Sequence, residues 1–133
     1  MDAQGPIGKK SHKQWMEIGG KRHYFKSSYE INYALFLQYK KEKGLIKEWE
    51  YEPQLFYFKG IKRGTTNYTP DFRITTNEDK QLWVEVKGFW DSRSITKMKR
   101  FRKYYPEHKI MAIDKSFFKE NEQMLKKAGC WHE

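Results

Sequence analysis

Two short segments of this sequence carry acidic and basic side chains at the spacing of β-strands. In the segment WVEVK, successive side chains of a strand would point to opposite faces. Glu85 and Lys87 would then share one face, about 6–7 Å apart along the strand, while Val84 and Val86 share the other. In the segment YTPDFRI the apolar positions alternate, and Asp71 faces away from them. If the two segments pair, Asp71 and Glu85 converge on one site.

Two converging carboxylates form a site for a hard divalent cation. Mg²⁺ keeps several waters and needs only one or two protein carboxylates, so Asp71 and Glu85 would suffice, and Mn²⁺ should substitute for it. Such a cation polarises a phosphodiester oxygen and lowers the pKa of a bound water. A lysine beside it, here Lys87, can hold the attacking water and offset charge in the transition state. The set predicts phosphodiester hydrolysis.

Each of these charged residues also has an ordinary structural explanation. Glu85 and Lys87 fit the solvated face of an amphipathic strand, and Asp71 follows a proline, which is common in turns. Glu30 stands three residues after Ser27, the spacing of a capping box, so its carboxylate could serve only the start of a helix. Chemistry is favoured by the joint pattern, because all four charged residues occur in order on segments that a fold would bring together.

Periodic patterns predict the first half of the fold. The Gly19-Gly20 pair between two short runs predicts a tight β-hairpin with positive φ. Residues 27–43 have apolar positions at helical spacing and predict a largely buried helix, which Gly44 ends in a left-handed conformation. Residues 45–58, then YTPDFRIT and QLWVEVKGF, predict three strands in an antiparallel meander.

The remaining segments complete an α/β (α+β) chain. Residues 93–105 predict an amphipathic basic helix with Ile95, Met98 and Phe101 facing the core. KIMAID predicts a short buried strand, and FFKENEQMLKKAG predicts a closing helix. We therefore expect a mixed β-sheet flanked by helices.

Length and composition set the domain organisation. A chain of 133 residues is long enough to bury one core, and its 17% aromatic content lets it fold although 33% of its residues are charged. Residues 1–14 lack apolar periodicity and predict a flexible basic arm, and residues 15–133 form one domain.

The charge balance favours nucleic acid as a partner. Lys and Arg number 27 and Asp and Glu number 17, which gives a net charge of +10. Such an excess attracts a polyanion, although it could also aid solubility or bind an anionic membrane surface. The residues that we expect to bind DNA are Lys9, Lys10 and Lys13 in the arm, and Arg93, Lys97, Lys99, Arg100, Arg102 and Lys103 in the basic helix.

Other classes of protein are disfavoured. No stretch is apolar enough to cross a bilayer, and the N-terminus lacks the apolar core of a signal peptide, so we expect an intracellular, cytoplasmic protein with no membrane partner. Cys130 is the only cysteine, which excludes an intrachain disulfide and a zinc site built from cysteines. The four histidines show no metal-ligand spacing.

Three segments resemble signature segments of the PD-(D/E)XK nuclease superfamily. YTPDF, which carries Asp71, resembles the first half-motif, and VEVKG, which carries Glu85 and Lys87, resembles the second. Glu85 comes fourteen positions after Asp71. Glu30, at the end of FKSSYE, sits where members carry an acidic residue on the first core helix.

The likeness is closer to one group in that superfamily: small phage-encoded nucleases, Holliday-junction-resolvase-like proteins and the endonuclease subunit of heteromeric transposases. It covers residues 19–114, most of the chain. Archaeal-type resolvases usually carry a basic residue directly after the first-helix acid, whereas this chain has Ile31 and Asn32 there.

The resemblance implies a restriction-endonuclease-like core and a role for each residue of the site. Asp71 and Glu85 would bind the metal together with the backbone carbonyl of Val86, Lys87 would position the water, and Glu30 would support the metal shell. It also implies a homodimer or a partner subunit, because a catalytic domain this small often needs one to cut both strands.

The sequence thus predicts a divalent-metal-dependent endonuclease that hydrolyses DNA, with branched or junction DNA from phage or mobile-element processing as its substrate. One alternative is a catalytically inactive nucleic-acid-binding module of the same fold. Another is an assembly protein whose basic surface binds an acidic partner chain, but that would leave the paired carboxylates unexplained.

Overall fold

The computed structural model of the protein describes residues 13–133. Its strands are β1 (Gln14–Ile18), β2 (Lys21–Phe25), β3 (Glu48–Tyr51), β4 (Phe56–Tyr57), β5 (Asn67–Tyr68), β6 (Phe72–Thr75), β7 (Gln81–Lys87) and β8 (Lys109–Asp114). Its helices are α1 (Ser28–Glu42), α2 (Ser92–Tyr104) and α3 (Lys115–Lys127). Most of the predicted arm lies outside the described residues, and Gln14 already belongs to β1.

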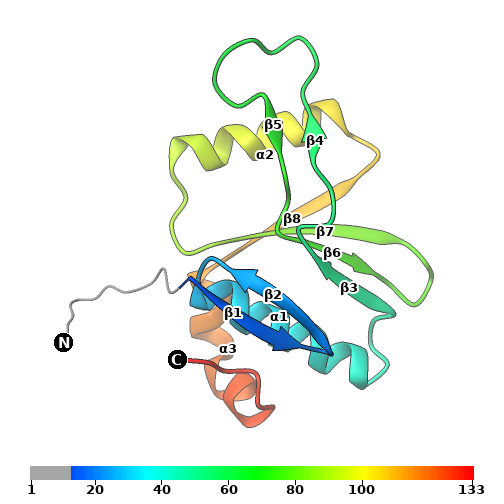
Figure 1. Cartoon of the computed structure of the whole chain (residues 1–133), viewed down its shortest axis with the longest axis vertical. Coiled ribbons are helices and arrows are strands. Elements are labelled where there is room, and N and C mark those ends of the chain that lie inside the picture. Colours follow the sequence, from blue (N-terminus) through cyan, green and yellow to red (C-terminus); the bar gives the residue numbers. More distant parts are fainter. Residues whose placement is uncertain (1–12) are drawn as a thin grey trace, which may run out of the picture.

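The four central strands form a mixed sheet in the order β3-β6-β7-β8 (Figure 1). β3 pairs with β6 and β6 with β7 in antiparallel fashion, which confirms the predicted three-strand meander. β8 then adds to β7 in parallel. β1 and β2 form a separate hairpin, and β4 and β5 a second short ribbon. The expected mixed sheet with flanking helices is therefore present.

The two faces of the sheet carry different hydrophobic clusters. Val84 and Val86 point into a cluster shared with α1, α3 and the β1–β2 hairpin. Trp83, one residue out of phase, points into a second cluster that includes Met98 and Phe101 of α2. Figure 1 accordingly shows α2 and the β4–β5 ribbon on one side of the sheet and α1 with α3 on the other. The predicted alternation along β7 is confirmed.

Local signals at α1 and its preceding hairpin act as predicted. The side chain of Ser27 accepts a hydrogen bond from the backbone N–H of Glu30 at 3.2 Å and caps the helix. Gly19 and Gly20 have φ of +66° and +83°, values that suit the tight turn, and Gly44 follows the helix at φ +76°. These turns fix how the hairpin lies across α1 (Figure 1).

Two predicted strands are wrong as continuous units. Residues 45–58 divide into β3 and β4, because Pro53 lacks an N–H for the ladder and Glu52 turns the chain at φ +47°. YTPDFRIT divides into β5 and β6 around Pro70. Consequently Tyr68 packs in the second cluster while Phe72 packs in the first, so they do not form the single apolar set that alternation predicted.

Two burial predictions are also wrong. Ile95 is 44% exposed, because the buried stripe of α2 runs through Ser94, Met98 and Phe101 and leaves Ile95 a helical step to one side. KIMAID does form β8, but as an edge strand in which Ile110 alone is buried. α2 also begins one residue earlier than predicted.

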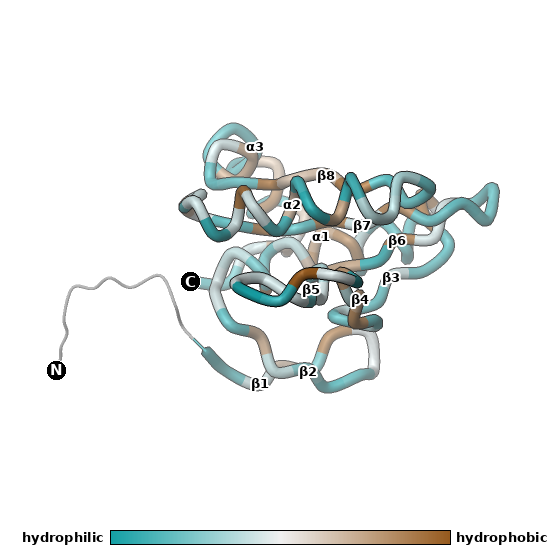
Figure 2. The backbone as a smooth tube through the Cα atoms, turned by 90° about the horizontal axis from the view of Figure 1, so that it is seen from above, coloured by the Kyte–Doolittle hydropathy of each residue, from teal (hydrophilic) through white to brown (hydrophobic). Residues whose placement is uncertain are grey.

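The helices bury different shares of their surface. α1 lies between the hairpin and the sheet (Figure 2). It buries residues on several sides, whereas α2 and α3 bury only a stripe. Within residues 13–133, no helix is both long and apolar enough to span a membrane.

Candidate active site

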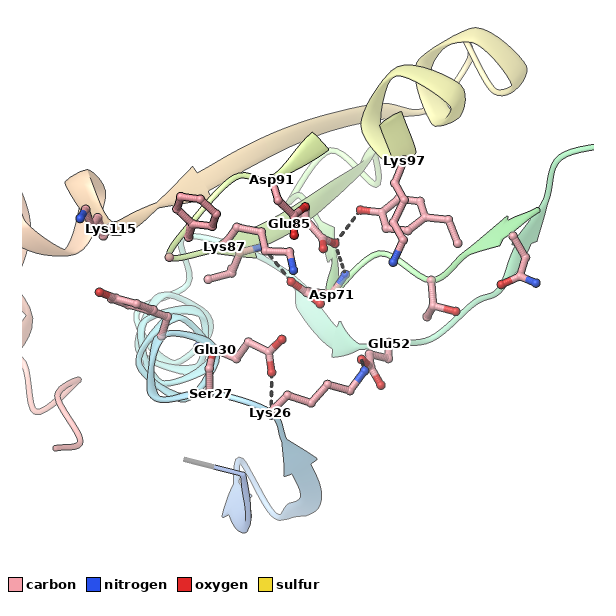
Figure 3. A pocket seen from close by; sticks show the side chains of 17 residues that line it. Lys26, Ser27, Glu30, Glu52, Asp71, Glu85, Lys87, Asp91, Lys97 and Lys115 are labelled. Atoms are coloured by element: carbon pink, nitrogen blue, oxygen red, sulfur yellow. Dashed lines mark hydrogen bonds and ion pairs between the residues drawn. The ribbon is translucent and has the colours of Figure 1, made fainter. Parts of the chain in front are cut away.

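A cleft of about 790 Å³ opens at the ends of β2 and β7, beside the starts of α1 and α2 (Figure 3). Glu30, Asp71, Glu85 and Lys87 all line it. They come from α1, from the residue before β6 and from β7, so segments distant in sequence supply one surface. The four residues that the sequence singled out for catalysis are thus brought together.

Asp71 and Glu85 are in direct contact. The backbone N–H of Asp71 donates to Glu85 Oε1 at 3.3 Å, and the backbone N–H of Val86 donates to Asp71 Oδ2 at 2.8 Å. Their exposed fractions are only 6% and 8%. A shared metal requires the two carboxylates to lie close together, and both side chains line the same cleft.

The break in the strand at Pro70 explains this contact. Pairing of β6 with β7 begins at Phe72 opposite Val84, so Asp71 lies just outside the ladder. Its backbone N–H is free to bond a side chain, and its carbonyl accepts the N–H of Glu52 at 2.7 Å. Asp71 is consequently held at three points without being a strand residue.

Tyr68 positions Glu85, a function that sequence reasoning missed. Its hydroxyl donates to Glu85 Oε1 at 2.5 Å, and its ring is buried in the second cluster. Lys97 lies over that ring, 6.0 Å from its centroid. Buried tyrosines normally find a partner for the hydroxyl, so the tyrosine in YTPDF was a signal that could have been used.

Burial and mutual repulsion raise the pKa values of these acids. Burial is the largest influence on Asp71, followed by the negative charges of Glu85 and Glu30, and its pKa lies well above the ordinary value. Burial raises the pKa of Glu85 to about 7, although the Tyr68 hydrogen bond and the charge of Lys87 oppose the shift. Both acids are therefore harder to ionise without a ligand, and a bound cation would stabilise their charged forms.

Glu30 serves the helix start and also faces the cleft. Its Oε1 accepts the backbone N–H of Lys26 and the hydroxyl of Tyr51, each at 2.8 Å. The backbone contact is thus to Lys26, one residue before the cap, where an ordinary capping box would use Ser27 itself. Burial raises the pKa of Glu30. Figure 3 shows its carboxylate pointing toward Asp71 and Lys87, so capping and support of a metal shell are compatible.

The donor set fits Mg²⁺ in number and kind. Among residues 13–133, no three or more His, Cys, Asp and Glu side chains are grouped as a metal centre, so any site here would rest on Asp71 and Glu85. Within that part of the chain, each of these acids has one oxygen with no hydrogen-bond partner, and neither oxygen is fully buried. Two accessible carboxylate oxygens, with water and the predicted Val86 carbonyl, suit a hard cation.

The structure divides the predicted DNA-binding residues of α2. Lys97 lines the cleft, and Arg100 donates to the carbonyl of Thr65 at 2.5 Å beside the β4–β5 ribbon. At 100° per residue, Arg93 shares the face of these two. Lys103 lies about 60° from Arg100 around the helix axis, whereas Lys99 and Arg102 lie about 100° or more from it, and all three are exposed. The predicted basic residues therefore do not share one face of α2.

The remaining basic residues include several that sequence reasoning missed. Lys26 and Lys115 line the cleft, and the exposed loop between β4 and β5 carries Lys59, Lys62 and Arg63. The basic run KGIKRG was a signal for that loop. Of the predicted arm residues, Lys13 is exposed, while Lys9 and Lys10 lie outside the described residues.

The chain matches no protein-family model, and no curated protein matches it. The resemblance to the PD-(D/E)XK superfamily therefore depends on the cleft residues and the motifs that carry them.

Proposed function

We propose that this protein is a divalent-metal-dependent endonuclease that hydrolyses phosphodiester bonds of DNA. One observation carries the proposal: two buried acids, Asp71 and Glu85, line one cleft and are joined by a hydrogen bond of 3.3 Å from the Asp71 backbone N–H to the Glu85 carboxylate, and Lys87 lines the same cleft. The mixed sheet, with α1 and α3 on one face and α2 on the other, supports a restriction-endonuclease-like core.

The chain's own residues divide the work. Asp71 and Glu85 would hold Mg²⁺ with the Val86 carbonyl, and Glu30 would bond a water of the metal shell. Lys87 would orient the attacking water and balance charge that builds on the phosphate. When bound, the metal supplies Lewis-acid polarisation of a phosphate oxygen and a lowered pKa for water.

Lys97 lines the cleft and would hold the DNA backbone next to the acids, and Arg100, beside the β4–β5 ribbon, would extend that contact. Contacts to phosphates carry no base code, so the proposal favours recognition of DNA shape, such as branched or junction DNA, over a fixed sequence. Equal cleavage of a four-way junction, a flap and a linear duplex would contradict this part of the proposal.

Cleavage of plasmid DNA in Mg²⁺ tests the main proposal. The protein should nick or linearise the plasmid, EDTA should stop it, and Mn²⁺ should restore it. Asp71→Asn is the matched control, because it keeps the shape of the side chain and removes its charge. DNA binding without cleavage by the native chain would instead support an inactive binding module of the same fold.

A further inference from the structure

The short connection between β7 and α2 carries an aromatic side chain that packing does not explain. Phe89 is 78% exposed, more than any other large hydrophobic side chain in residues 13–133, and it lines the cleft. A phenyl ring in water contributes nothing to the hydrophobic core. Its placement therefore requires another reason.

The neighbours of Phe89 hold this connection in place. Gly88 lies so close to Tyr29 that an added Cβ would stand 2.5 Å from the tyrosine ring. Trp90 packs against the second hydrophobic cluster. The carboxylate of Asp91 caps α2 by accepting a backbone N–H at 2.8 Å. Phe89 thus stands on a loop that is anchored on both sides.

The cleft that Phe89 lines holds lysines as well as the acids described above. Lys87 precedes it by two residues, and Lys97 and Lys115 line the same cleft. An aromatic face for a base, with ammonium groups nearby for phosphates, is the arrangement by which proteins hold single-stranded nucleic acid. Bases within a duplex are already stacked on their neighbours. An unpaired nucleotide is the occupant that fits this ring.

We propose that Phe89 is a stacking platform for an unpaired nucleobase beside the phosphodiester bond held at Asp71 and Glu85. The inference rests on the proposed nuclease function and narrows its substrate. The preferred DNA carries unpaired nucleotides at the cut, as flaps, forks and open junctions do, and fully paired duplex is a poorer ligand. Lys97 and Lys115 would contact the phosphates on either side of the stacked base.

Binding is measured with Ca²⁺ in place of Mg²⁺, using a flapped duplex and a fully paired duplex of the same sequence. The first flap nucleotide is 2-aminopurine, whose fluorescence falls when it stacks. The native chain should quench this signal. Phe89→Ala should abolish the quenching and weaken binding of the flapped DNA roughly 5- to 150-fold, the usual range for one base–aromatic stack. Binding of paired duplex should change less than about two-fold.

Two further variants separate stacking from general effects. Phe89→Trp keeps an aromatic face and should retain quenching, whereas Phe89→Leu should lose it. Leu45→Ala is the matched control, because Leu45 is 59% exposed and does not line the cleft. It should bind both DNAs as the native chain does.

The inference would be overturned if Phe89→Ala weakened the binding of flapped and paired DNA equally, or if the variant still quenched the 2-aminopurine fluorescence. So would a change in the sedimentation of the free protein on Phe89→Ala, which would assign the ring to contact between chains. Cleavage in Mg²⁺ is scored separately. If the native chain stacks the base but does not cleave DNA, the stacking inference stands and the nuclease proposal fails. If Phe89→Ala cleaves both DNAs as the native chain does, the nuclease proposal stands and the stacking inference fails.

Discussion

Two places on the same central sheet hold acidic side chains in opposite circumstances. Glu50 of β3 faces Arg73 of β6, and the guanidinium donates two hydrogen bonds to the carboxylate, at 2.8 and 2.9 Å. Asp71, directly before β6, and Glu85, on β7, contact each other and have no comparable cation pairing within residues 13–133. The first pair is partly exposed, whereas the second is buried.

The difference between these two pairs separates an acid that serves the fold from acids that need a ligand. A surface carboxylate paired with arginine contributes a small stabilisation and needs nothing more. Two buried carboxylates that repel each other destabilise the fold unless a ligand compensates them. Stability alone does not account for Asp71 and Glu85, and the proposed metal site would give their burial a purpose.

The largest effect should follow from removing a charge at the buried pair. Asp71→Asn or Glu85→Gln should reduce Mg²⁺-dependent cleavage on the order of 10³-fold or more, because a metal contributes several kcal/mol to transition-state stabilisation. Both variants should remain folded by circular dichroism. Substantial cleavage by either variant, measured over a plasmid nicking time course, would contradict the assigned site.

The sequence predicted that Asp71 and Glu85 would lie together, but it did not predict the contacts that hold them there. Alternation in WVEVK correctly placed Glu85 and Lys87 opposite Val84, because the period of a strand leaves one choice once a face is buried. It failed for Tyr68, because alternation assumes an unbroken strand and Pro70 breaks this one. The bond from the Tyr68 hydroxyl to Glu85 depends on that break.

Tertiary context also hid the other cleft residues. Phe89 and Lys115 lie 26 residues apart, and parallel pairing of β7 with β8 carries the chain back to the same cleft edge. No local pattern encodes a parallel crossover of that kind. Ile95 was misassigned for a related reason: the small Ser94 lies on the buried stripe of α2, and apolar character alone gave the wrong phase.

The second effect concerns the lysine beside the pair. Lys87→Ala should lower cleavage by a factor on the order of 10², since a contact made in the transition state is lost while the metal ligands stay. Mg²⁺ affinity, followed as a shift in melting temperature with Mg²⁺ concentration, should change little. If the variant loses metal binding as well, Lys87 organises the acids and does not position water.

A third substitution separates the two functions of Glu30. Glu30→Gln can still accept the Lys26 N–H and Tyr51 hydroxyl, so chemical denaturation should show nearly native stability. Cleavage should fall about 10- to 100-fold, the usual cost of losing a group that supports a metal shell. Unaltered cleavage would assign Glu30 to the helix start alone.

The metal's effect on stability should depend on pH. Glu85 has a pKa raised to about 7 in the fold, above its unfolded value of 4.5, so without metal its contribution to stability is present below pH 4.5 and is lost as pH rises through about 7. Mg²⁺ at one hundred times its Kd should restore about 2.7 kcal/mol at pH 8 and much less at pH 5, where protons compete. Melting curves at both pH values measure this, and a pH-independent shift would contradict it.

The smallest effect is expected at the compensated pair. Glu50→Gln removes one charge of the Glu50–Arg73 ion pair, whose side chains are 36% and 22% exposed, and should cost about 0.2–1 kcal/mol in urea unfolding. Cleavage should stay native, because neither residue lines the cleft. Without metal, Asp71→Asn should instead raise the free energy of unfolding, because it relieves repulsion by Glu85 and Glu30. Destabilisation by both variants to the same extent would mean that Asp71 and Glu85 are held together as Glu50 and Arg73 are, for the fold alone.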